Sequence, residues 1–326
     1  MKNVGIVGLG HYLPRHRLTN FDLEKMVDTT DEWIRTRTGI SERRVADHHE
    51  KTSDLAVNAA REAIKNAKLS SDKIDLIIVA TISPDSNFPS VSCLVQKALG
   101  AVNAVAFDIG AACSGFLYAL TTAKQFIQSG LYRNALVIAA EKITSLIDWE
   151  DRNTCVLFGD GAGACVLTQV KKPHGIIAEY MHSQGELGEL MQVVVSDRRH
   201  PLKKYHTPTH LPYVVMQGKE LFKVAVNSMV DAVQIAAQKA HVKFSDVDWV
   251  VPHQANDRII SAVAERLEIP KEKIFVNIDK YGNMSAASIA VALYEAVHQK
   301  KIKKGSLVVL VAFGAGLVSA ANIVRW

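Results

Sequence analysis

The sequence predicts an α/β protein built from two similar halves. Short runs of β-branched residues alternate with stretches of helical periodicity, a pattern typical of parallel sheets covered by helices. The same order of elements occurs within residues 51–141 and again within residues 219–316. The chain has 326 residues, of which 48% are hydrophobic, so it is long enough for two domains or one large α/β unit with a sizeable core.

The first repeated unit is a long helix, a Ser-Asp turn and a buried strand. This unit is predicted over residues 51–83 and again over residues 219–254. The tripeptide Ala-Val-Asn lies in both helices, at 56–58 and 225–227, and Ser-Asp precedes both strands. The recurrence indicates an internal duplication.

The second repeated unit is a strand, a turn of small residues and a helix. It is predicted over residues 104–126 and again over residues 274–297. Each half then closes on an apolar strand, at 134–141 in the first half and at 306–316 in the second. Two such halves are expected to meet at a pseudo-twofold axis.

The seam between the halves is expected near "KKPHG", where the first set of elements ends. This divides the chain into residues 1–172 and 173–326. The segment 197–213 is basic and rich in His and Pro, which is typical of a surface loop or insertion.

Composition narrows the class of partner and the compartment. The net charge is +5, but the basic residues are scattered and aromatic residues make up only 7%, which favours an acidic or phosphorylated partner over nucleic acid. The four cysteines form no CxxC pair and fit a reduced compartment. No segment has the apolar length of a signal peptide or of a membrane span, so we expect a cytoplasmic protein without membrane insertion.

Three segments look like cofactor-binding or metal-binding sites, but we expect none of them to bind a cofactor or a metal. "GIVGLGHYLP" has Leu13 where a dinucleotide-binding loop needs its third glycine. "FGDGAGACVL" lacks the Lys-Ser/Thr of a P-loop, and close backbone packing explains its glycines better. His200, His206 and His210 lie among Pro and Lys residues, as in an exposed loop. We expect no metal.

Cys113 is the candidate nucleophile. It follows the apolar strand of "DIGAACSGFLYAL" at the start of a helix, among small residues that let the backbone approach a substrate closely. A helix N-terminus lowers the pKa of a thiol and favours thiolate, and the N–H of Cys113 could stabilise an oxyanion. Free cysteines more often act as small buried hydrophobes, and Cys93, Cys155 and Cys165 are assigned that role.

His253 and Asn283 are the candidate partners of this cysteine. His253 ends the strand of "DWVVPHQAN", and Asn283 lies in "YGNMSAAS", where the matching strand of the second half meets its helix. Ligands of open α/β sheets gather outside the carboxyl ends of strands, so the duplication brings the three side chains toward one region. Both partners can donate a hydrogen bond to a carbonyl oxygen as it gains negative charge, and neither needs to be charged. Taken singly, each is more often a structural residue.

The segments "DIGAACSGF", "VPHQAN" and "GNMSAAS" resemble, in this order, the active-site motifs of β-ketoacyl-acyl-carrier-protein synthase III, a condensing enzyme of the thiolase superfamily. The resemblance extends over essentially the whole chain. It includes "TTDEWIRTRTGI", "EDRNT", "LFGDGAGA" and "MQGKELFKVAV".

The resemblance implies a duplicated five-layer αβαβα fold, a homodimer, and the initiating step of bacterial-type fatty acid synthesis. Cys113 would take an acetyl group from acetyl-CoA. Malonyl-acyl-carrier protein would then lose CO2 while His253 and Asn283 hold its thioester oxygen, and the carbanion would attack the acyl group, giving acetoacetyl-acyl-carrier protein. Covalent catalysis divides one difficult step into two easier ones. CoA thioesters are substrates here, and no cofactor is implied.

The resemblance also implies binding roles for single residues. Trp33 would stack on the CoA adenine with Arg152, and Arg37 would contact a CoA phosphate. The other positions along the CoA path are Thr29, Gly218, Phe222, Ala225 and Asn256. The positions implied to meet the acidic carrier protein are Gln254, Ala255, Asn256, Asp257 and Arg258, with Lys223 and Arg266 nearby. The acyl-pocket positions are Ile82 and Phe158 of the same chain and Phe88, which would cross a dimer interface.

The chain departs from the family pattern at three positions. Met284 replaces a common Thr and Asn153 replaces a usual Gly. Ala315 stands where a glycine N–H normally completes the oxyanion hole, which survives if the backbone angle suits a residue with Cβ. The departures put substrate preference and rate in question more than the reaction type. The primer, whether acetyl, propionyl or branched, is left open, although the bulk of Ile82 favours a short one.

Two alternatives stay open at this point. One is a paralogous synthase of secondary metabolism that uses the same three residues on a different acceptor. The other is a non-catalytic thiolase-fold partner subunit, although such a subunit has no need of Cys113, His253 and Asn283 together. Thiolase and HMG-CoA-type chemistry is disfavoured because Asn283 stands where Glu or Cys would be expected.

Overall fold

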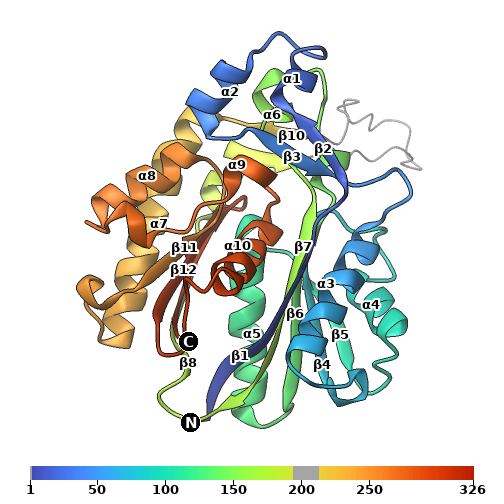
Figure 1. The fold of residues 1–326 in the computed structure, drawn as a ribbon, viewed down its shortest axis with the longest axis vertical. Coiled ribbons are helices and arrows are strands. Elements are labelled where there is room, and N and C mark those ends of the chain that lie inside the picture. Colours follow the sequence, from blue (N-terminus) through green and yellow to red (C-terminus); the bar gives the residue numbers. More distant parts are fainter. Residues whose placement is uncertain (1, 194–212) are drawn as a thin grey trace.

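The computed structural model describes residues 2–193 and 213–326, and its two large sheets alternate with three layers of helices (Figure 1). The first sheet has the spatial order β1 (Asn3–Tyr12), β7 (Gly161–Val170), β6 (Asn134–Glu141), β4 (Leu76–Ala80) and β5 (Val105–Ile109). The second has the order β8 (Gly175–Ser183), β13 (Val318–Arg325), β12 (Leu307–Gly314) and β11 (Trp249–Pro252). The duplicated five-layer fold predicted from the sequence is confirmed.

The helices form one central layer and two outer layers. The central helices are α5 (Gly115–Ser129) and α10 (Ala286–His298), which contact each other and both sheets. The outer face of the first sheet is covered by α3 (Thr52–Asn66) and α4 (Val91–Leu99). The outer face of the second is covered by α7 (Gly218–Ala240), with α8 (Asp257–Arg266) beside it.

The strand directions show the duplication directly. In the first sheet β1–β7 and β7–β6 are antiparallel, while β6–β4 and β4–β5 are parallel. In the second sheet β8–β13 and β13–β12 are antiparallel, while β12–β11 is parallel. Residues 171–174 connect β7, in the first sheet, to β8, the first strand of the second. The elements β1, β7, β6 and β4 therefore correspond to β8, β13, β12 and β11.

The strand expected at the start of residues 274–297 is not formed. Only Ile274 pairs with the sheet, as a parallel bridge to Val250, at the place that β5 has in the first half. Side-chain hydrogen bonds replace the ladder here, because Gln254 donates to Phe275 O (3.2 Å) and accepts from Asn277 N (2.9 Å). The short helix α9 (Ile278–Tyr281) follows.

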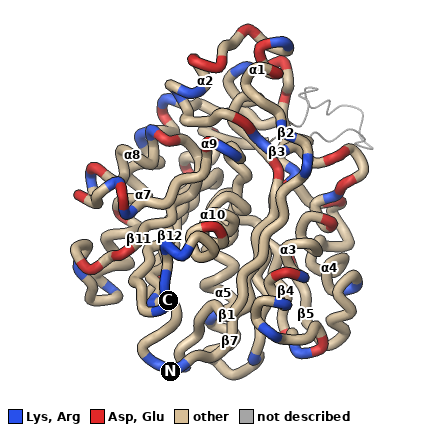
Figure 2. The backbone as a smooth tube through the Cα atoms, viewed as in Figure 1, with Lys and Arg blue, Asp and Glu red and all other residues tan. Residues whose placement is uncertain are grey.

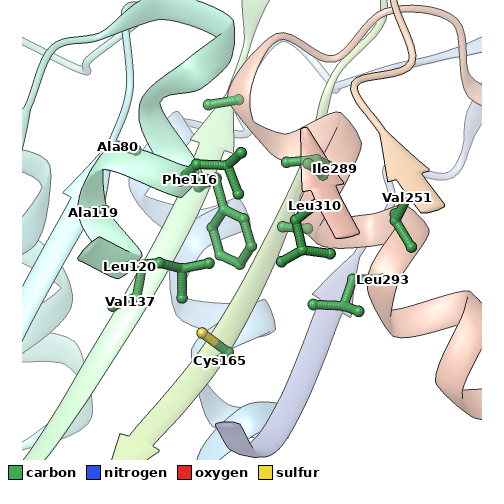
Figure 3. Close-up of a cluster of buried hydrophobic side chains, with 14 of the residues drawn as sticks. Ala80, Phe116, Ala119, Leu120, Val137, Cys165, Val251, Ile289, Leu293 and Leu310 are labelled. Carbon is green, nitrogen blue, oxygen red and sulfur yellow. The ribbon is translucent and has the colours of Figure 1, made fainter. Parts of the chain in front are cut away.

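The largest hydrophobic cluster lies around the central helices. Figure 3 shows Phe116 and Leu120 of α5 opposite Ile289 and Leu293 of α10, all fully buried. Val137 of β6 lies among them. Burying a side chain of this size contributes about 1.5–3 kcal/mol, so this shared cluster holds the two halves together.

The remaining elements lie together at one end of the molecule, at the top of Figure 1. These elements are β2 (His16–Thr19), α1 (Asn20–Leu23), α2 (Asp31–Thr38), β3 (Glu42–Val45), α6 (Arg152–Cys155), β9 (Met191–Val193) and β10 (Val214–Met216). A separate buried cluster, which includes Leu23, Ile34 and Phe158, supports them. The predicted surface loop, with His200, His206 and His210, falls almost entirely outside the described residues.

The glycine-rich segments serve close packing. A Cβ at Gly10 of β1 would lie 2.2 Å from Ala59 O of α3, so this glycine lets the helix approach the strand. A Cβ at Gly163 of β7 would lie 2.5 Å from Ala290 Cβ of α10. This close backbone packing agrees with the interpretation of both segments as structural. Across the two described ranges, no helix has the length and apolar character needed to span a bilayer.

Gly163→Ala tests the packing of α10 on β7. The added methyl would force the helix away from the strand, and we expect the free energy of unfolding to fall by about 1–3 kcal/mol. Gly185→Ala is the matched control, because a methyl there meets no atom within 4 Å. Urea unfolding followed by circular dichroism measures both variants. Equal midpoints for the wild type and Gly163→Ala would contradict this packing argument.

Candidate active site

One cavity brings together the three side chains singled out from the sequence. It has a volume of about 160 Å3, and its lining includes Cys113, His253 and Asn283. Cys113 follows β5, His253 follows β11, and Asn283 precedes α10. All three are nearly inaccessible to solvent. Their convergence is a direct result of the duplication, which places the corresponding turns of both halves at the same point.

The backbone around Cys113 is tightly packed. Cys113 lies in a single 3-10 turn, Ala112–Ser114, that leads into α5, and Ala112 has a positive φ of 43°. A Cβ at Gly314, the last residue of β12, would lie 2.6 Å from Cys113 N. The second half therefore presses directly on the backbone of the candidate nucleophile, and only glycine fits at position 314.

The expectation of a lowered pKa for Cys113 is wrong for this closed site. Burial raises the pKa of the Cys113 thiol to about 12, and the negative charge of Glu141 adds to the effect, while the Ser285 hydroxyl opposes it. The helix start is visible in the sequence, but the loss of water around the sulfur, which has the opposite effect on the pKa, is not. The resting nucleophile is a thiol, and it must lose its proton when it reacts.

His253 is held as a neutral imidazole. Its main-chain N–H donates to Val311 O (2.8 Å), and its carbonyl accepts from Ala255 N (3.0 Å). Burial lowers the pKa of His253 to about 3. Its Nδ1 atom is buried and has no hydrogen-bond partner among the described residues. This agrees with the expectation that His253 acts as a neutral donor.

Asn283 is anchored to the other half of the chain. Its N–H donates to Leu157 O (2.9 Å), and its carbonyl accepts from Gly159 N (3.1 Å). Its side-chain Oδ1 accepts from Ser285 N (2.9 Å). With the oxygen held in this way, the amide NH2 is left to donate to a ligand in the cavity.

The two N–H groups expected to form the oxyanion hole are available to a ligand. In the described part of the chain, neither Cys113 N nor Ala315 N donates a hydrogen bond to another group. Ala315 lies in the turn between β12 and β13 and does not have a positive φ, while its neighbour Gly316 does (136°). A residue with Cβ is therefore accommodated at position 315.

The other two departures from the family pattern are also accommodated. Met284 is buried, and its sulfur would lie 2.6 Å from a Cβ at Gly161, so its side chain packs directly over that glycine. Asn153 is exposed in α6 and donates through both its main-chain and side-chain nitrogens to Asp151 (2.9 Å each). Neither change disturbs the three central side chains.

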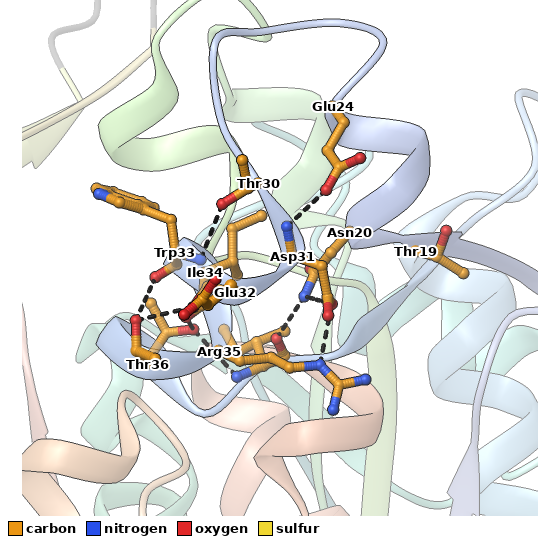
Figure 4. Close-up of polar contacts among 12 residues, drawn as sticks. Thr19, Asn20, Glu24, Thr30, Asp31, Glu32, Trp33, Ile34, Arg35 and Thr36 are labelled. Carbon is orange, nitrogen blue, oxygen red and sulfur yellow. Dashed lines mark hydrogen bonds and ion pairs between the residues drawn. The ribbon is translucent and has the colours of Figure 1, made fainter.

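Helix α2 presents Trp33 at the surface. Figure 4 shows its indole directed away from the polar contacts that hold the helix, which is capped by Thr30 through a bond from Trp33 N (3.1 Å). The guanidinium carbons of Arg37 and Arg152 lie 5.3 and 5.0 Å from the ring centre. This group of one indole and two cations is suited to a flat base and its phosphates.

The residues assigned to the CoA path fall into two groups. Four of them line the cavity, namely Gly218, Phe222, Ala225 and Asn256. The other four, Thr29, Trp33, Arg37 and Arg152, lie outside its described lining. Asn256 links the groups, because it caps α8 and its side chain donates to Arg37 O on α2 (3.1 Å). The Thr29 hydroxyl is buried, with no partner in the described ranges.

Only one of the three acyl-pocket candidates lines this cavity, namely Phe158. Ile82 is half-buried and packs on the cluster that contains Phe158 instead. Phe88 is 85% exposed and lies outside the described lining. A single chain therefore forms the channel to Cys113 but does not complete the acyl pocket with these residues.

One residue assigned to carrier-protein docking is not available for it. Gln254 is buried, and its side chain bonds to Pro252 O (2.8 Å), Phe275 O and Asn277 N, so it is a structural residue. Ala255 and Asn256 line the cavity, and Asp257 begins α8. The exposed basic candidates are Arg258, Lys223 and Arg266, the last of which donates to Asn227. Figure 2 shows residues of both charges over α7 and α8.

The sequence analysis missed several cavity residues. They are Leu157, Met191, Met216, Leu221, Ile259, Phe313 and Gly314. Most are apolar residues in helices, strands or their ends, and nothing in their pattern separates a channel wall from a core. Glu141, a buried residue outside the described lining, was not predicted either, although a charged residue at the end of the apolar strand 134–141 was a usable signal.

Comparison with known proteins covers the whole chain. Residues 107–185 match the family model of 3-oxoacyl-[acyl-carrier-protein (ACP)] synthase III, and residues 237–326 match its C-terminal model. β-Ketoacyl-[acyl-carrier-protein] synthase III of Caldanaerobacter subterraneus is 50% identical over 99% of this chain and 97% of that protein.

Two solved structures extend the comparison. The crystal structure of 3-oxoacyl-[acyl-carrier-protein] synthase III from Aquifex aeolicus has a TM-score of 0.92 and 52% identity, over 99% of this chain and all of that one. The priming β-ketosynthase of the R1128 polyketide pathway has a TM-score of 0.92 and 35% identity, over 99% and 96% of the two chains.

Fold and site together define a condensing enzyme of the thiolase type. The chain has a buried thiol between two duplicated halves, and a synthase structure matches it over 99% of its length. Within that class, the chain belongs to the 3-oxoacyl-[acyl-carrier-protein] synthase III family. It is an acyltransferase, the initiating condensing enzyme of fatty acid synthesis.

The neutral state of His253 predicts a dependence of stability on pH. Because the folded state has a pKa of about 3, the unfolded state binds a proton below pH 6.5 that the folded state does not bind. The contribution of His253 to the free energy of unfolding is fully present above pH 6.5. It decreases as the pH falls, by up to about 1.4 kcal/mol per pH unit. His253→Gln removes the titrating group.

We therefore expect the free energy of unfolding to fall less steeply from pH 6.5 to 4.5 in His253→Gln than in the wild type. Urea titrations at each pH measure it. His48→Gln, a substitution of an exposed histidine, is the matched control. Parallel curves for the wild type and His253→Gln would show that the buried ring does not resist protonation.

Proposed function

We propose that this protein transfers an acetyl group from acetyl-CoA to Cys113 and condenses it with malonyl-acyl-carrier protein. The products are acetoacetyl-acyl-carrier protein, CoA and CO2. The observation that carries the proposal is one cavity in which a thiol faces two neutral donors, His253 and Asn283, in a chain of this family. No cofactor or metal is needed, because the substrates are activated thioesters. We further propose that the enzyme works in the cytoplasm.

The first half-reaction forms an acyl-enzyme. The Cys113 sulfur attacks the thioester carbon, and the N–H groups of Cys113 and Ala315 hold the oxyanion that develops on the carbonyl oxygen. Collapse of the intermediate expels CoA and leaves an acetyl thioester on Cys113. Donors that are fixed by the turns of both halves need no reorganisation during the step.

The second half-reaction depends on donors that are not acids. Loss of CO2 from the malonyl group leaves an electron pair that is delocalised onto the thioester oxygen, which His253 and Asn283 hold by hydrogen bonds. A protonated imidazole would quench the carbanion, whereas a ring with a pKa of about 3 stays neutral and keeps its N–H. The carbanion then attacks the acetyl group on Cys113 and expels its sulfur.

Substrate entry is supported by the features at the mouth of the cavity. The cavity of about 160 Å3, lined mostly by apolar residues, suits the pantetheine arm that CoA and the carrier protein share. The indole of Trp33 and the guanidinium groups of Arg37 and Arg152 suit the nucleotide of CoA. We propose that the adenine stacks on Trp33 together with the guanidinium of Arg152.

We propose a homodimer that completes the acyl pocket. Among the described strands, β5 is at the end of the first sheet and has one neighbour, β4. Exposed apolar side chains lie close to this edge in sequence, among them Phe88, Val102 and Val105. Pairing of two copies along β5 would cover them, and Phe88 would then reach the acyl pocket of the partner subunit.

A second candidate function is the priming of a polyketide chain on another carrier protein. It is favoured by the 35% identity to the R1128 priming β-ketosynthase. The chemistry at Cys113 would be the same, and only the acyl group and the acceptor would differ. Incubation with a panel of acyl-CoAs and then with malonyl-carrier proteins of both kinds, followed by mass spectrometry, separates the two functions.

Cys113→Ser tests the assignment of the nucleophile. The wild type should gain an acetyl mass after incubation with acetyl-CoA, and the variant should not, because a hydroxyl is a far weaker nucleophile. Asn283→Ala is the matched variant, since it should still be acetylated but should no longer decarboxylate malonyl-acyl-carrier protein. An adduct on Cys113→Ser, or the loss of both reactions in Asn283→Ala, would contradict the proposed division of roles.

Arg258→Glu tests the docking face. Arg258 is the second residue of α8 and is exposed, and an acidic carrier helix would be repelled by the new charge. We expect turnover with the carrier protein to fall about tenfold while acetylation by acetyl-CoA changes little. Lys65→Glu, on the outer helix of the other half, is the control of equal charge change. Equal losses in both half-reactions of Arg258→Glu would remove this face from the proposal.

A further inference from the structure

A buried carboxyl group lies beside the nucleophile and has no part in the reaction described so far. Glu141 is the last residue of β6, and its side chain is fully buried. It accepts hydrogen bonds from Ser83 Oγ (2.6 Å), Thr81 Oγ1 (3.1 Å) and Ile82 N (3.1 Å), all on its Oε2 atom. Three donors on one oxygen indicate a site built to hold a carboxylate.

The second oxygen of Glu141 is much less satisfied. Its described hydrogen bond is a long one from Ile82 N (3.3 Å). Burial raises the pKa of Glu141 to about 7, and the donors, Ser285 among them, oppose the rise. The carboxyl is thus able to exist in both protonation states near neutral pH.

Ser285 lies close to the nucleophile and the carboxyl. A Cβ at Gly115, two residues after Cys113, would lie 3.4 Å from the Cβ of Ala286, which follows Ser285, and 3.0 Å from the Cβ of Ala80, the last residue of the strand beside β6. In agreement with this placement, the Ser285 hydroxyl lowers the pKa of both Cys113 and Glu141. It is 1% exposed, yet its Oγ makes no hydrogen bond of normal geometry within the described residues. A buried hydroxyl without a partner is unfavourable by about 1–3 kcal/mol, so its retention calls for a function.

The backbone of Ser285 supports the same conclusion. Its φ of 49° and ψ of −129° belong to a region that residues with Cβ rarely adopt. Such strain persists where the surroundings impose it and is concentrated at functional sites. Here it directs the main-chain N–H to Asn283 Oδ1 (2.9 Å).

We propose that Ser285 and Glu141 take up the proton that the Cys113 thiol loses when it attacks the acyl thioester. This inference rests on the proposed function and adds the proton acceptor that it lacks. In this scheme Ser285 passes the proton on, and Glu141 is the base that accepts it.

The step balances as follows. The S–H bond breaks, and its electron pair forms the bond between Cys113 sulfur and the thioester carbon. The proton moves to Ser285 Oγ, whose own proton moves to Glu141, so the carboxylate becomes a carboxylic acid. The negative charge passes to the carbonyl oxygen and leaves with the CoA sulfur, which is protonated by solvent.

The acceptor is restored in the second half-reaction. The carbanion attacks the acyl group, and the tetrahedral intermediate expels the Cys113 sulfur as a thiolate. That thiolate takes the proton back from Glu141 by the reverse route through Ser285. One proton is therefore stored on the carboxyl for as long as the acyl-enzyme lasts.

Other ionisable groups packed around this point are already engaged. Lys142, next in the chain, points its ammonium to Asp47 O (2.8 Å) and Glu50 O (2.6 Å). Asp160 accepts from Ala46 N (2.8 Å) and Thr144 Oγ1 (2.7 Å). Across the cavity His253 is neutral and is a very weak base, since its pKa is about 3. Of these groups, Glu141 is therefore the one that can accept the proton from Cys113.

Glu141→Gln tests the proposal in single-turnover acetylation followed by intact mass. A general base contributes about 100-fold or more, so we expect acetylation to slow by at least that factor. The wild-type rate should rise with pH near 7, as Glu141 ionises, and the variant should lose that rise. Decarboxylation of malonyl-acyl-carrier protein, which uses His253 and Asn283, should stay within about twofold of the wild type.

Two further variants complete the design. Glu141→Asp should recover about tenfold of the rate lost in Glu141→Gln, because it restores the base. Ser285→Ala should slow acetylation as much as Glu141→Gln, and the double variant should be no slower than either single one. Melting curves of each protein verify that it is folded.

Several outcomes would overturn the proposal. Faster acetylation in Glu141→Gln would mean that the carboxylate only disfavours the thiolate by its charge. A parallel loss of decarboxylation would mean a structural role, and wild-type acetylation in Ser285→Ala would remove the route through the hydroxyl.

Failure of the wild type to acetylate would contradict the proposed function instead. In that case the pH profile of Cys113 alkylation by iodoacetamide still tests the proton acceptor, and identical profiles in Glu141→Gln and the wild type would exclude it.

Discussion

The contact between the first turns of α5 and α10 is the constraint on which the site depends. A Cβ at Gly115, the first residue of α5, would lie 3.4 Å from Ala286 Cβ, the first residue of α10, and 3.0 Å from Ala80 Cβ. At the same point Gly314 approaches Cys113 N. Side chains of any size here would separate the two halves, and with them the thiol, the imidazole and the amide.

The overall fold was predictable because the order of residues shows the periodicities of strands and helices and shows that they repeat. The convergence of Cys113, His253 and Asn283 was predictable for the same reason. The strand expected from residue 274 was not formed, since Gln254 supplies hydrogen bonds that a ladder would otherwise provide. The ionisation of Cys113 depends on desolvation by residues distant in sequence, which no local pattern contains.

The site combines groups that burial affects in opposite ways. Loss of water keeps His253 uncharged, as the decarboxylation step requires, but it also makes the Cys113 thiol harder to ionise. One desolvated cavity therefore helps the second half-reaction and hinders the first. A carboxyl with a pKa of about 7 on the side of the thiol resolves this conflict without bringing a permanent charge near the imidazole.

The small volume of the cavity has a consequence for the lifetime of the acetylated protein. A pantetheine arm that occupies this cavity displaces the water in it. While such an arm is in place, few solvent molecules can reach the thioester on Cys113. Hydrolysis of the acetylated protein is therefore confined to the interval between the departure of one substrate and the arrival of the next.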